Sequence, residues 1–376
     1  MDITLDNRKD LFLERTIFRE YISKDLINKI LKSGKIKYSD YNSSPEDLWY
    51  SKLNYKNEKI NNPEHHLKIY LDNYDDLKVR YKKFHHPWGR IYPELSVNIL
   101  KAYIRRTLLK DDYYDFDIIG TYPKILRNIC DKNGISCPVL KRVIKERDDI
   151  LEYIIRECNF TNDRNGKTYA KDLIFINFYN GDEDDIRNKL NFYGINDNFV
   201  LPPVFKELKE EMDRIKVELI KRNPLLYEYC KKTFKNVYNK IFMGNKNTLG
   251  RDTLNGYFIS LYLQEQELRI VDKITSWLYN NTNVMKKNGL NGYFIYEYDG
   301  FMLLKENVDR EFGGPENFVR ILNGKMDEYG IGLEWENKRL DENIMELEDI
   351  EMDYGNLVIL SISLILIYLI YIYKNG

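Results

Sequence analysis

The sequence contains few of the residues that mark disulfide-rich, zinc-finger, collagen-like or disordered proteins. Its 376 residues include only four cysteines, four histidines, ten prolines and 20 glycines. The cysteines form no Cys-x-x-Cys pair and we read no signal peptide at the start, so we expect free thiols in a reducing compartment. Neither cysteines nor acidic residues stand at a zinc-finger spacing from the histidine pairs, and scarce proline and glycine exclude collagen-like and linker-rich classes.

The chain also lacks an excess of charge of either sign. Its 58 lysines and arginines almost balance 59 aspartates and glutamates, which gives a net charge of −1. This excludes a uniformly basic protein that coats nucleic acid, although it leaves room for a locally basic groove. Residues 51–110 carry 13 basic against 6 acidic residues, with aromatic residues between them. Cations for phosphates and rings for bases suit a nucleic-acid groove, and a solvated helical face is the alternative.

One long hydrophobic run departs from the pattern of a soluble protein. Residues 357–373 are uncharged, and as a helix they would span about 26 Å, close to the core of a thin bilayer. We interpret this run as a transmembrane tail anchor, with a buried core helix as the alternative. The acidic residues 341–356 before it read as a solvated spacer. These features predict a membrane-associated protein whose folded body faces the cytosol.

The remaining chain predicts an α+β body over residues 56–340, preceded by a helical extension over residues 1–55. Apolar residues alternate in some short segments and recur at helical spacing in longer ones. We therefore expect one small antiparallel sheet whose strands are separated in sequence by a long helical insertion. The expected elements that matter below are strands at 113–119 and 331–335, a hairpin at 292–305, and helices at 138–156 and 167–179.

Two aspartates that are far apart in sequence are the main chemical signal. Asp117 lies in the first expected strand, and Asp299 lies at the Asp-Gly turn of the expected hairpin. On adjacent strands their carboxylates can meet, and such hard oxygen ligands hold the Mg²⁺ ions that in-line phosphoryl transfer needs. Asp115 shares the face of Asp117 by strand alternation and is a candidate to assist the site. A strand cap, a solvated acid and an ordinary hairpin turn are the alternatives.

A stripe of cations and rings lies between the two aspartates in sequence. Lys167, Lys171, Phe175 and Tyr179 follow one another at steps of four. Steps of four place all four side chains along one face of a helix. Two cations followed by two rings could bind triphosphate oxygens and stack on a base. An ordinary amphipathic helix is the alternative.

Together these motifs resemble family A DNA polymerases and single-subunit phage RNA polymerases, and most of all their relatives in the transposon-virus polymerase group. The resemblance covers about residues 80–345. It rests on an ordered set of motifs rather than on one. In chain order the motifs are WGRIYP (88–93), AYIRRTLL (102–109), YYDFDIIGTYPKILRNICDKNGISCPVLKRVIKERDDIL (113–151), KTYAKDLIFINFYNG (167–181), SLYLQEQE (260–267) and YEYDGFMLLK (296–305).

The resemblance implies a right-hand-like palm, built on a small antiparallel sheet, with a mostly helical fingers insertion. It implies a DNA polymerase that binds a DNA primer-template and dNTPs, with a helicase or primase as a further partner. Asp117 and Asp299 would bind two Mg²⁺ or Mn²⁺ ions, and Lys171 would complete the catalytic set by holding the triphosphate. The other implied sites are Lys167, Phe175, Tyr179 and Tyr122 for the nucleotide, and Arg90, Arg105, Arg106, Gln264 and Glu267 for nucleic acid.

Two departures from the group pattern bear on activity. Tyr122 stands where the group usually has histidine, five residues after Asp117, a position that carries a bulky gate against the ribose 2′-hydroxyl in family A enzymes. A bulky tyrosine there favours dNTPs over NTPs. Tyr179-Asn180-Gly181 replaces the usual Tyr-Gly-Gly. We predict a polymerase of viral or mobile-element origin, with a catalytically inactive descendant that binds nucleic acid or a protein at a membrane as the alternative.

Overall fold

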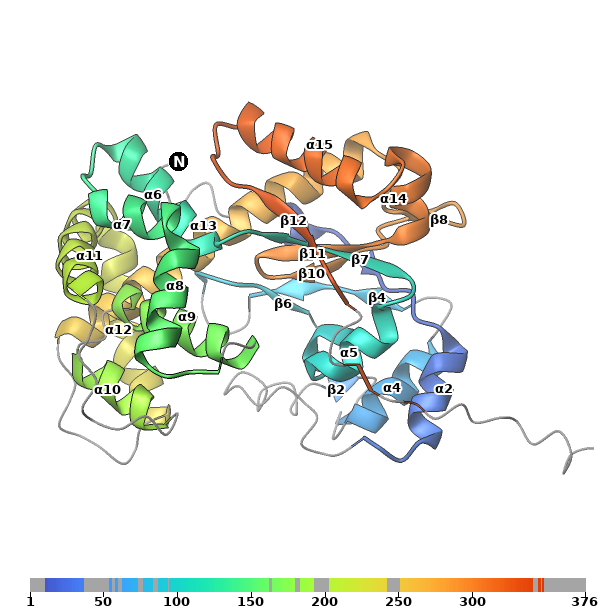
Figure 1. The fold of residues 1–376 in the computed structure, drawn as a ribbon. Helices are drawn as coiled ribbons and strands as arrows, with labels where there is room; N and C mark the ends of the chain where they lie inside the picture. Colours follow the sequence, from blue (N-terminus) through green and yellow to red (C-terminus); the bar gives the residue numbers. More distant parts are fainter. Residues whose placement is uncertain are drawn as a thin grey trace, which may run out of the picture.

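A small antiparallel sheet lies at the centre of the computed structural model. The structure describes residues 11–36, 54–55, 58–59, 63–73, 77–83, 87–93, 95–161, 164–179, 183–192, 203–241, 251–340, 344–345 and 347. The sheet has four strands in the order β10–β11–β7–β12, and every neighbouring pair is antiparallel. Its strands are β7 (Tyr113–Ile118), β10 (Ile295–Glu297), β11 (Gly300–Leu304) and β12 (Trp335–Lys338). Figure 1 shows this sheet between a large helical group and a smaller one.

Strand β7 places acidic side chains on one face of the sheet and aromatic ones on the other. Because side chains alternate along a strand, Asp115 and Asp117 share one face and Phe116 points to the opposite face. The Phe116 ring packs edge-on against Phe318 at 4.7 Å between centroids, and tilted against Phe301 at 6.0 Å. Burying each ring contributes about 2–3 kcal/mol. This aromatic packing fixes the register, because a slip of one residue would move the aromatic side chains to the face that carries the two aspartates.

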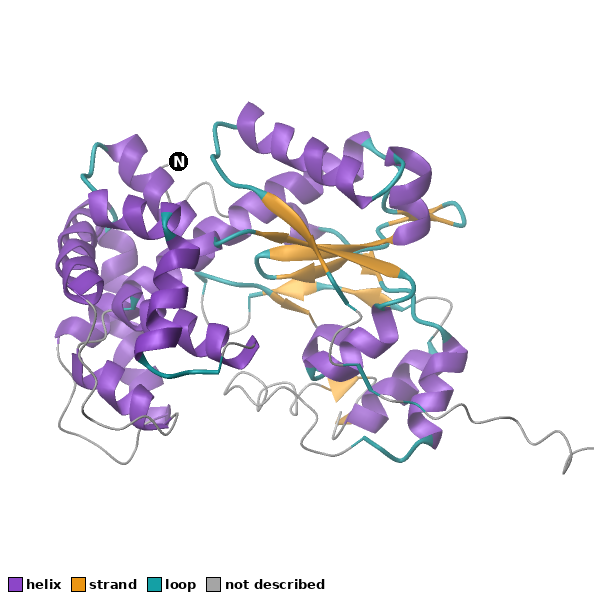
Figure 2. Cartoon of the chain, in the orientation of Figure 1, coloured by secondary structure: helices purple, strands orange, loops and turns teal. Residues whose placement is uncertain are grey.

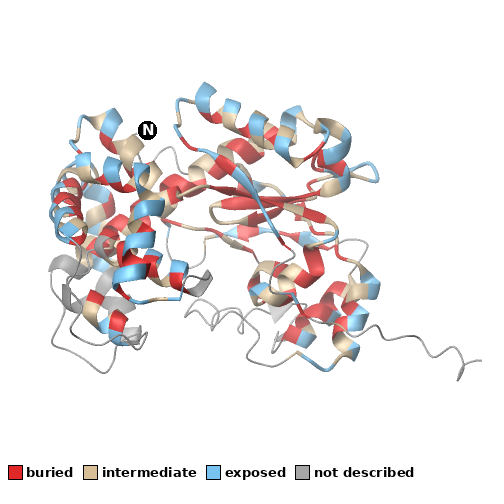
Figure 3. Ribbon diagram, in the orientation of Figure 1, coloured by how far each residue is buried: buried red, intermediate tan, exposed pale blue. Residues whose placement is uncertain are grey.

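Helices after β11 cover the aromatic face. Helix α14 (Lys305–Phe312) and helix α15 (Pro315–Glu328) lie along the same side of the sheet (Figure 2). Proline is well placed at the start of α15, because the first residues of a helix need no backbone N–H partner. Trp335 of β12 donates its backbone N–H to Asn323 of α15 at 2.7 Å, which ties the last strand to this layer. In Figure 3 the central strands are almost entirely buried.

The long helical insertion between β7 and β10 forms the larger helical group. The predicted helix over 138–156 is interrupted at Glu146, whose φ and ψ are −102° and 25°. The buried carboxylate of Glu211 accepts hydrogen bonds from the backbone N–H groups of Val139 (3.1 Å) and Leu140 (2.7 Å), so it caps the first half. The helices are α6 (Thr121–Asn133), α7 (Pro138–Lys145), α8 (Arg147–Glu157), α9 (Arg164–Phe178), α10 (Glu183–Phe192), α11 (Pro203–Arg222), α12 (Pro224–Ile241) and α13 (Arg251–Asn281).

The N-terminal segments pack under the other end of the sheet and form a second core. Buried Glu20 lies in this core and accepts hydrogen bonds from the Tyr70 hydroxyl at 2.5 Å and the Val97 N–H at 3.0 Å. Burial raises the pKa of Glu20 to about 7. The remaining described elements are α1 (Phe12–Arg15), β1 (Phe18–Arg19), α2 (Lys24–Lys32), β2 (Asn54–Tyr55), β3 (Glu58–Lys59), α4 (Pro63–Asp72), β4 (Lys78–Val79), β5 (Tyr81–Lys82), β6 (Tyr92–Pro93), η3 (Val97–Ile99), α5 (Ala102–Leu109), β8 (Lys286–Lys287) and β9 (Leu290–Asn291).

The structure corrects two predictions about the C-terminal part of the chain. The last strand begins at Trp335, later than the predicted 331–335, because Ile331 and Leu333 make local hydrogen bonds at the end of α15. The fold class predicted a transmembrane helix, but among the described helices none is both long and apolar enough to cross a membrane. The longest, α13, carries buried carboxylates such as Glu265 along its length.

The segment predicted to cross a membrane, residues 357–373, lies outside the described residues. The described residues correct the fold class to a mostly helical α+β fold with small antiparallel sheets, in which no described helix could cross a membrane. The predicted domain boundaries and membrane-associated location stay predictions.

Candidate active site

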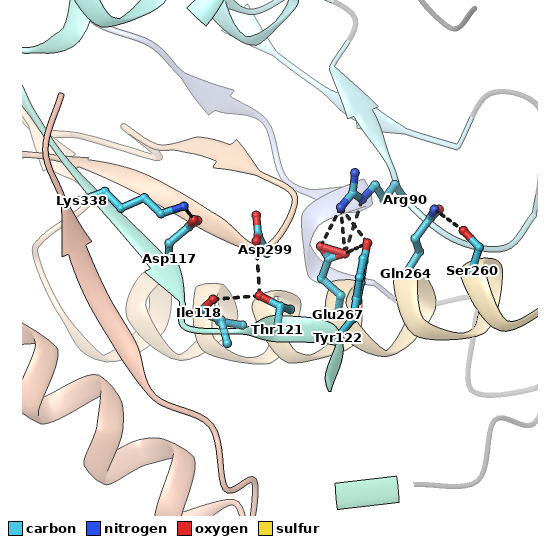
Figure 4. A network of polar contacts seen from close by, with 10 residues as sticks. All are labelled: Arg90, Asp117, Ile118, Thr121, Tyr122, Ser260, Gln264, Glu267, Asp299 and Lys338. Carbon is cyan, nitrogen blue, oxygen red and sulfur yellow. Dashed lines mark hydrogen bonds and ion pairs between the residues drawn. The ribbon is translucent and has the colours of Figure 1, made fainter. Parts of the chain in front are cut away.

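The sheet brings Asp117 and Asp299 onto neighbouring segments, as the sequence predicted. In the register of β7 and β11, Asp117 pairs with Gly300, so Asp299 directly precedes its partner. The Ile118 N–H donates to the Asp299 carbonyl oxygen at 3.1 Å and extends this pairing by one step. Figure 4 shows the two carboxyl groups side by side on the two segments. The positions of Asp117 and Asp299 are therefore set by the pairing of β7 with β11.

Gly300 makes this approach possible. A Cβ at position 300 would overlap the side-chain oxygen of Asp117 and the carbonyl oxygen of Phe116. The turn itself is formed by Tyr298 and Asp299, and Tyr298 adopts the left-handed conformation with φ of 51°. The predicted turn at Asp299-Gly300 is thus displaced by one residue. Glycine is needed here for the space above it rather than for a positive φ.

Several carboxyl groups gather around this point in low-dielectric surroundings. Burial, with Glu297 nearby, raises the pKa of Asp115 to about 7. Burial also raises the pKa values of Glu297 and Asp299 above their usual range. Basic and polar neighbours oppose this effect. Arg105 pairs with Glu297 at 2.8 Å, and the charge of Arg90 lowers the pKa of Asp299. The Thr121 hydroxyl also donates to Asp299 at 3.3 Å. The site is therefore a buried cluster of carboxyl groups with basic side chains around it.

Lys338 of β12 supplies one positive charge to this site. Its ammonium group forms an ion pair with the carboxylate of Asp117 (Figure 4). The Lys338 side chain is 47% exposed, whereas that of Asp117 is 5% exposed. In the register of β12 and β7, Lys338 pairs with Asp115 and Glu336 pairs with Asp117. Sequence reasoning missed Lys338, because it placed the last strand too early.

A buried polar network lies next to the two aspartates. The fully buried carboxylate of Glu267 on α13 forms an ion pair with Arg90 at 3.2 Å and accepts a hydrogen bond from the Tyr122 hydroxyl at 2.7 Å. Arg90 also donates to the Tyr122 hydroxyl oxygen at 2.7 Å, and its guanidinium lies 4.3 Å from the centroid of the Tyr298 ring. Burial raises the pKa of Glu267 to about 7, and the positive charge of Arg90 opposes that rise. Tyr122 is thus held in place from two sides.

The stripe on α9 reaches this network through its aromatic end. The rings of Phe175 and Tyr179 stack with centroids 6.2 Å apart, and Tyr179 meets Tyr122 edge-on at 6.4 Å. Lys171 lies one turn before Phe175 and is exposed. Desolvation and the nearby Arg147 lower the pKa of Lys171.

The electrostatics also connect α9 to the sheet. The negative charge of Glu336, which pairs with Asp117 across β12 and β7, offsets part of this lowering of the Lys171 pKa. The exposed Lys167, one turn earlier, acts on Lys171 as a like charge and lowers its pKa further. Lys171 is therefore close enough to β12 to interact electrostatically with Glu336.

The residues predicted to bind nucleic acid differ from one another in their contacts within the protein. Arg105 pairs with Glu297, and Arg90 pairs with Glu267, so both arginines have acidic partners within the protein. Arg106 is partly buried on α5. Gln264 donates its side-chain amide to the Ser260 hydroxyl at 3.1 Å on the same helix.

Glu265, which sequence reasoning missed, is fully buried between the predicted residues Gln264 and Glu267. It binds Lys83 at 2.9 Å and Arg269 at 3.2 Å. It also accepts a hydrogen bond from the Gly89 N–H at 3.1 Å. These contacts fasten the segment that carries Arg90 to α13. The only signal in the sequence was an acidic residue at a core-facing position of a long helix.

The ligands available to a metal ion are Asp117 and Asp299. In the part of the chain that the structure describes, no group of three or more histidine, cysteine, aspartate or glutamate side chains is placed to hold a metal ion. Mg²⁺ is often bound by one or two carboxylates, and water and substrate phosphates complete its coordination. The two carboxylates therefore fit a divalent-cation site whose coordination water or a ligand completes, and they do not fit a site built from protein ligands alone.

Comparisons with known proteins find a likeness in solved structures but none in sequence. No protein-family model matches the chain, and no curated protein sequence matches it. A solved structure described as the POL domain of Pol1 from M. smegmatis in complex with DNA primer-template and dNTP is similar, with a TM-score of 0.42 and 9% sequence identity. The match covers 85% of this chain and 67% of that one. The likeness is distant and concerns the fold alone.

Proposed function

We propose that this chain catalyses templated nucleotidyl transfer as a DNA polymerase-like enzyme with a two-metal mechanism. The observation that carries the proposal is the approach of Asp117 and Asp299 on paired segments, with Gly300 leaving room for the Asp117 carboxylate. Carboxylates that converge from distant parts of a chain are the ligands that in-line phosphoryl transfer requires. The order of motifs, similar to that of the transposon-virus polymerase group, supports replication of a viral or mobile element as the setting.

Asp117 and Asp299 are the residues that would hold the divalent ions, Mg²⁺ or Mn²⁺. When bound, such ions polarise the phosphate oxygens and favour attack by the primer 3′-oxygen. Thr121 orients the Asp299 carboxyl through its hydroxyl, and Gly300 keeps the space around Asp117 open. In the structure Lys338 neutralises Asp117, so its ammonium has to give way when a cation takes that carboxylate.

The helix α9 would bind the incoming nucleotide. Lys171, assisted by Lys167 one turn earlier, would hold the triphosphate by charge. The stacked rings of Phe175 and Tyr179 would line the base, and Tyr122 would crowd the sugar 2′-position. Hydrogen bonds to Arg90 and Glu267 fix the position of the Tyr122 ring. A fixed ring beside the sugar supports exclusion of the ribose 2′-hydroxyl and hence a preference for dNTPs.

The remaining predicted residues would contact the primer-template. Arg106 and Gln264 would contact the nucleic acid, and the internally paired Arg90, Arg105 and Glu267 would shape the surface that it meets. A helicase or primase partner is supported by the resemblance in sequence alone.

Primer extension tests the proposal. The full chain would be incubated with a labelled primer on a DNA template, Mg²⁺ or Mn²⁺, and either dNTPs or NTPs. Asp117→Ala and Asp299→Ala would be assayed beside the wild type. We expect extension with dNTPs that both substitutions abolish. Extension that survives both substitutions, or its absence with every metal and sugar, would contradict the proposal.

A second candidate is a catalytically inactive relative that binds nucleic acid. The ion pair between Lys338 and Asp117 favours it, because a lysine at a metal-binding carboxylate opposes metal binding. In this case the wild type would bind a primer-template in a mobility-shift assay but would not extend it. Retention of Asp117, Asp299 and Lys171 favours the enzyme.

A further inference from the structure

A pocket lies on the side of α13 that faces away from Gln264. Residues three and four apart share a helix face, and Gln266, Arg269 and Lys273 form such a stripe along the pocket. Asn128 of α6 lies on the opposite wall, and Tyr329, at the end of α15, closes one side. The pocket encloses about 90 Å³. It is therefore built from three helices and is separate from the site that contains the two aspartates.

Three described residues that line this pocket each carry a buried hydrogen-bond donor without a partner. Among the described residues, Nε2 of Gln266, Nη2 of Arg269 and Nδ2 of Asn128 have no hydrogen-bond partner, and all three residues line the pocket. Gln266 as a whole is only 8% exposed. Buried donors are nearly always paired, and each unpaired one costs about 1–3 kcal/mol. The pocket has room for more than one water, so a ligand there would displace water to reach these donors.

The charge of the pocket selects an anion. Its described lining includes the cationic Lys132, Arg269 and Lys273 and no acidic side chain. The ammonium of Lys273 lies 3.5 Å from the centroid of the Tyr329 ring, which holds it beside the pocket. Arg269 directs Nε toward Glu265 at 3.2 Å, which leaves Nη2 for a ligand. Three donors and a surplus of positive charge call for oxygen acceptors that carry negative charge.

The rest of the pocket lining is apolar, so it suits an anion that also carries a hydrophobic group. Isoleucines of α6, of α13 and of the segment after α15 form most of the remaining wall, together with two tyrosine rings. The volume is smaller than the roughly 150 Å³ cavity that holds benzene. We propose that this pocket binds a small organic carboxylate, with its oxygens at Gln266, Asn128 and Arg269 and its short apolar body against the isoleucines.

Ligand-observed NMR tests this assignment on the full chain. The probes are isobutyrate, which is a branched four-carbon carboxylate, isobutyramide, which has the same shape without the charge, and inorganic phosphate, which lacks the apolar body. We expect isobutyrate to bind at least about tenfold more tightly than either other probe, a difference of about 1.4 kcal/mol. Equal affinity for isobutyramide or phosphate, or no binding of isobutyrate, would overturn the assignment.

Two nearly isosteric substitutions locate the binding. Gln266→Glu and Asn128→Asp each replace a donor by a negatively charged acceptor, so each should weaken isobutyrate binding at least about tenfold. Asn280→Asp makes the same change in charge on the exposed far end of α13 and should leave binding unchanged. Circular dichroism melting identifies a variant that fails to fold, in which case the other variant decides. Unchanged binding in a folded variant would contradict the proposed site.

Discussion

Gly300 lies directly opposite Asp117, and the Asp117 carboxylate occupies the space that a side chain at position 300 would need. This relationship explains why an Asp-Gly pair stands at the hairpin. The aspartate supplies the second carboxyl group, and the glycine lets the first one approach it. The two positions are thus coupled by packing as well as by chemistry.

Gly300→Ala should remove most of the activity while the protein stays folded. The new methyl group overlaps the Asp117 carboxylate, and a misplacement of about 1 Å in an active site can cost about 100-fold in rate. The crowding should also lower the free energy of unfolding by about 1–3 kcal/mol. Single-nucleotide incorporation and urea unfolding measure the two effects. Gly324→Ala on α15 is the control, since nothing lies within 4 Å of its Cβ position; equal rates in both variants would refute the steric account.

Lys338→Met should lower the concentration of Mg²⁺ needed for half-maximal primer extension. The half-exposed ammonium competes with a cation for Asp117, and ion pairs of this exposure contribute about 0.5–1 kcal/mol, so we expect a two- to fivefold decrease. A titration of the extension rate against Mg²⁺ gives the concentration needed for half-maximal extension. The control is Lys325→Met, which removes the ion pair between Lys325 and Glu328 on α15. An unchanged or increased Mg²⁺ requirement would show that Lys338 does not compete for the carboxylate.

Substitutions of Tyr122 should separate the bulk of its ring from its hydrogen bonds. Tyr122→Ala opens the space at the sugar and should reduce the preference for dNTPs over NTPs by about 10- to 100-fold. Tyr122→Phe keeps the ring but loses the hydroxyl contacts with Glu267 and Arg90, so most of the preference should remain. Steady-state kcat/KM values for a matched dNTP and NTP report both effects. Selectivity that is the same in Tyr122→Ala and the wild type would exclude Tyr122 as the gate.

Features of the site that depend on residues close together in the sequence could be predicted from the sequence. Local patterns were enough to locate Asp117 in a strand and Asp299 beside a turn, because strand alternation and turn residues act over a few positions. The same holds for the spacing of Lys171, Phe175 and Tyr179 on one helix, of which the two rings stack.

Partners that come from distant parts of the chain could not be predicted. Lys338 meets Asp117 only because β12 pairs with β7 in one register, and that register is fixed by burial of the aromatic face. Likewise, nothing near Glu267 in sequence indicates that it holds both Arg90 and Tyr122. The α+β class followed from the order of elements. The transmembrane part of the predicted fold class was wrong.

Buried Glu20 should make stability depend on pH. Burial in the folded state raises the pKa of Glu20 from 4.5 to about 7. Between these two pH values the folded state keeps a proton that the unfolded state releases. The free energy of unfolding should therefore fall as pH rises through the window, by about 3 kcal/mol for this group. Glu20→Gln, which does not titrate, should gain stability relative to the wild type between about pH 5 and about pH 8. Urea unfolding at both pH values measures this, with the exposed Glu152→Gln as control; a constant difference would contradict the assignment to Glu20.

The central claim is that Asp117 and Asp299 act as one unit, and single-turnover incorporation of one dNTP tests it most directly. Rates would be measured for the wild type, Asp117→Asn, Asp299→Asn and the double variant. Because residues that act together are strongly non-additive, each single substitution should reduce the rate about as much as the double one. A single variant that keeps the wild-type rate, or reductions that multiply in the double variant, would show that the two carboxylates do not share one reaction centre.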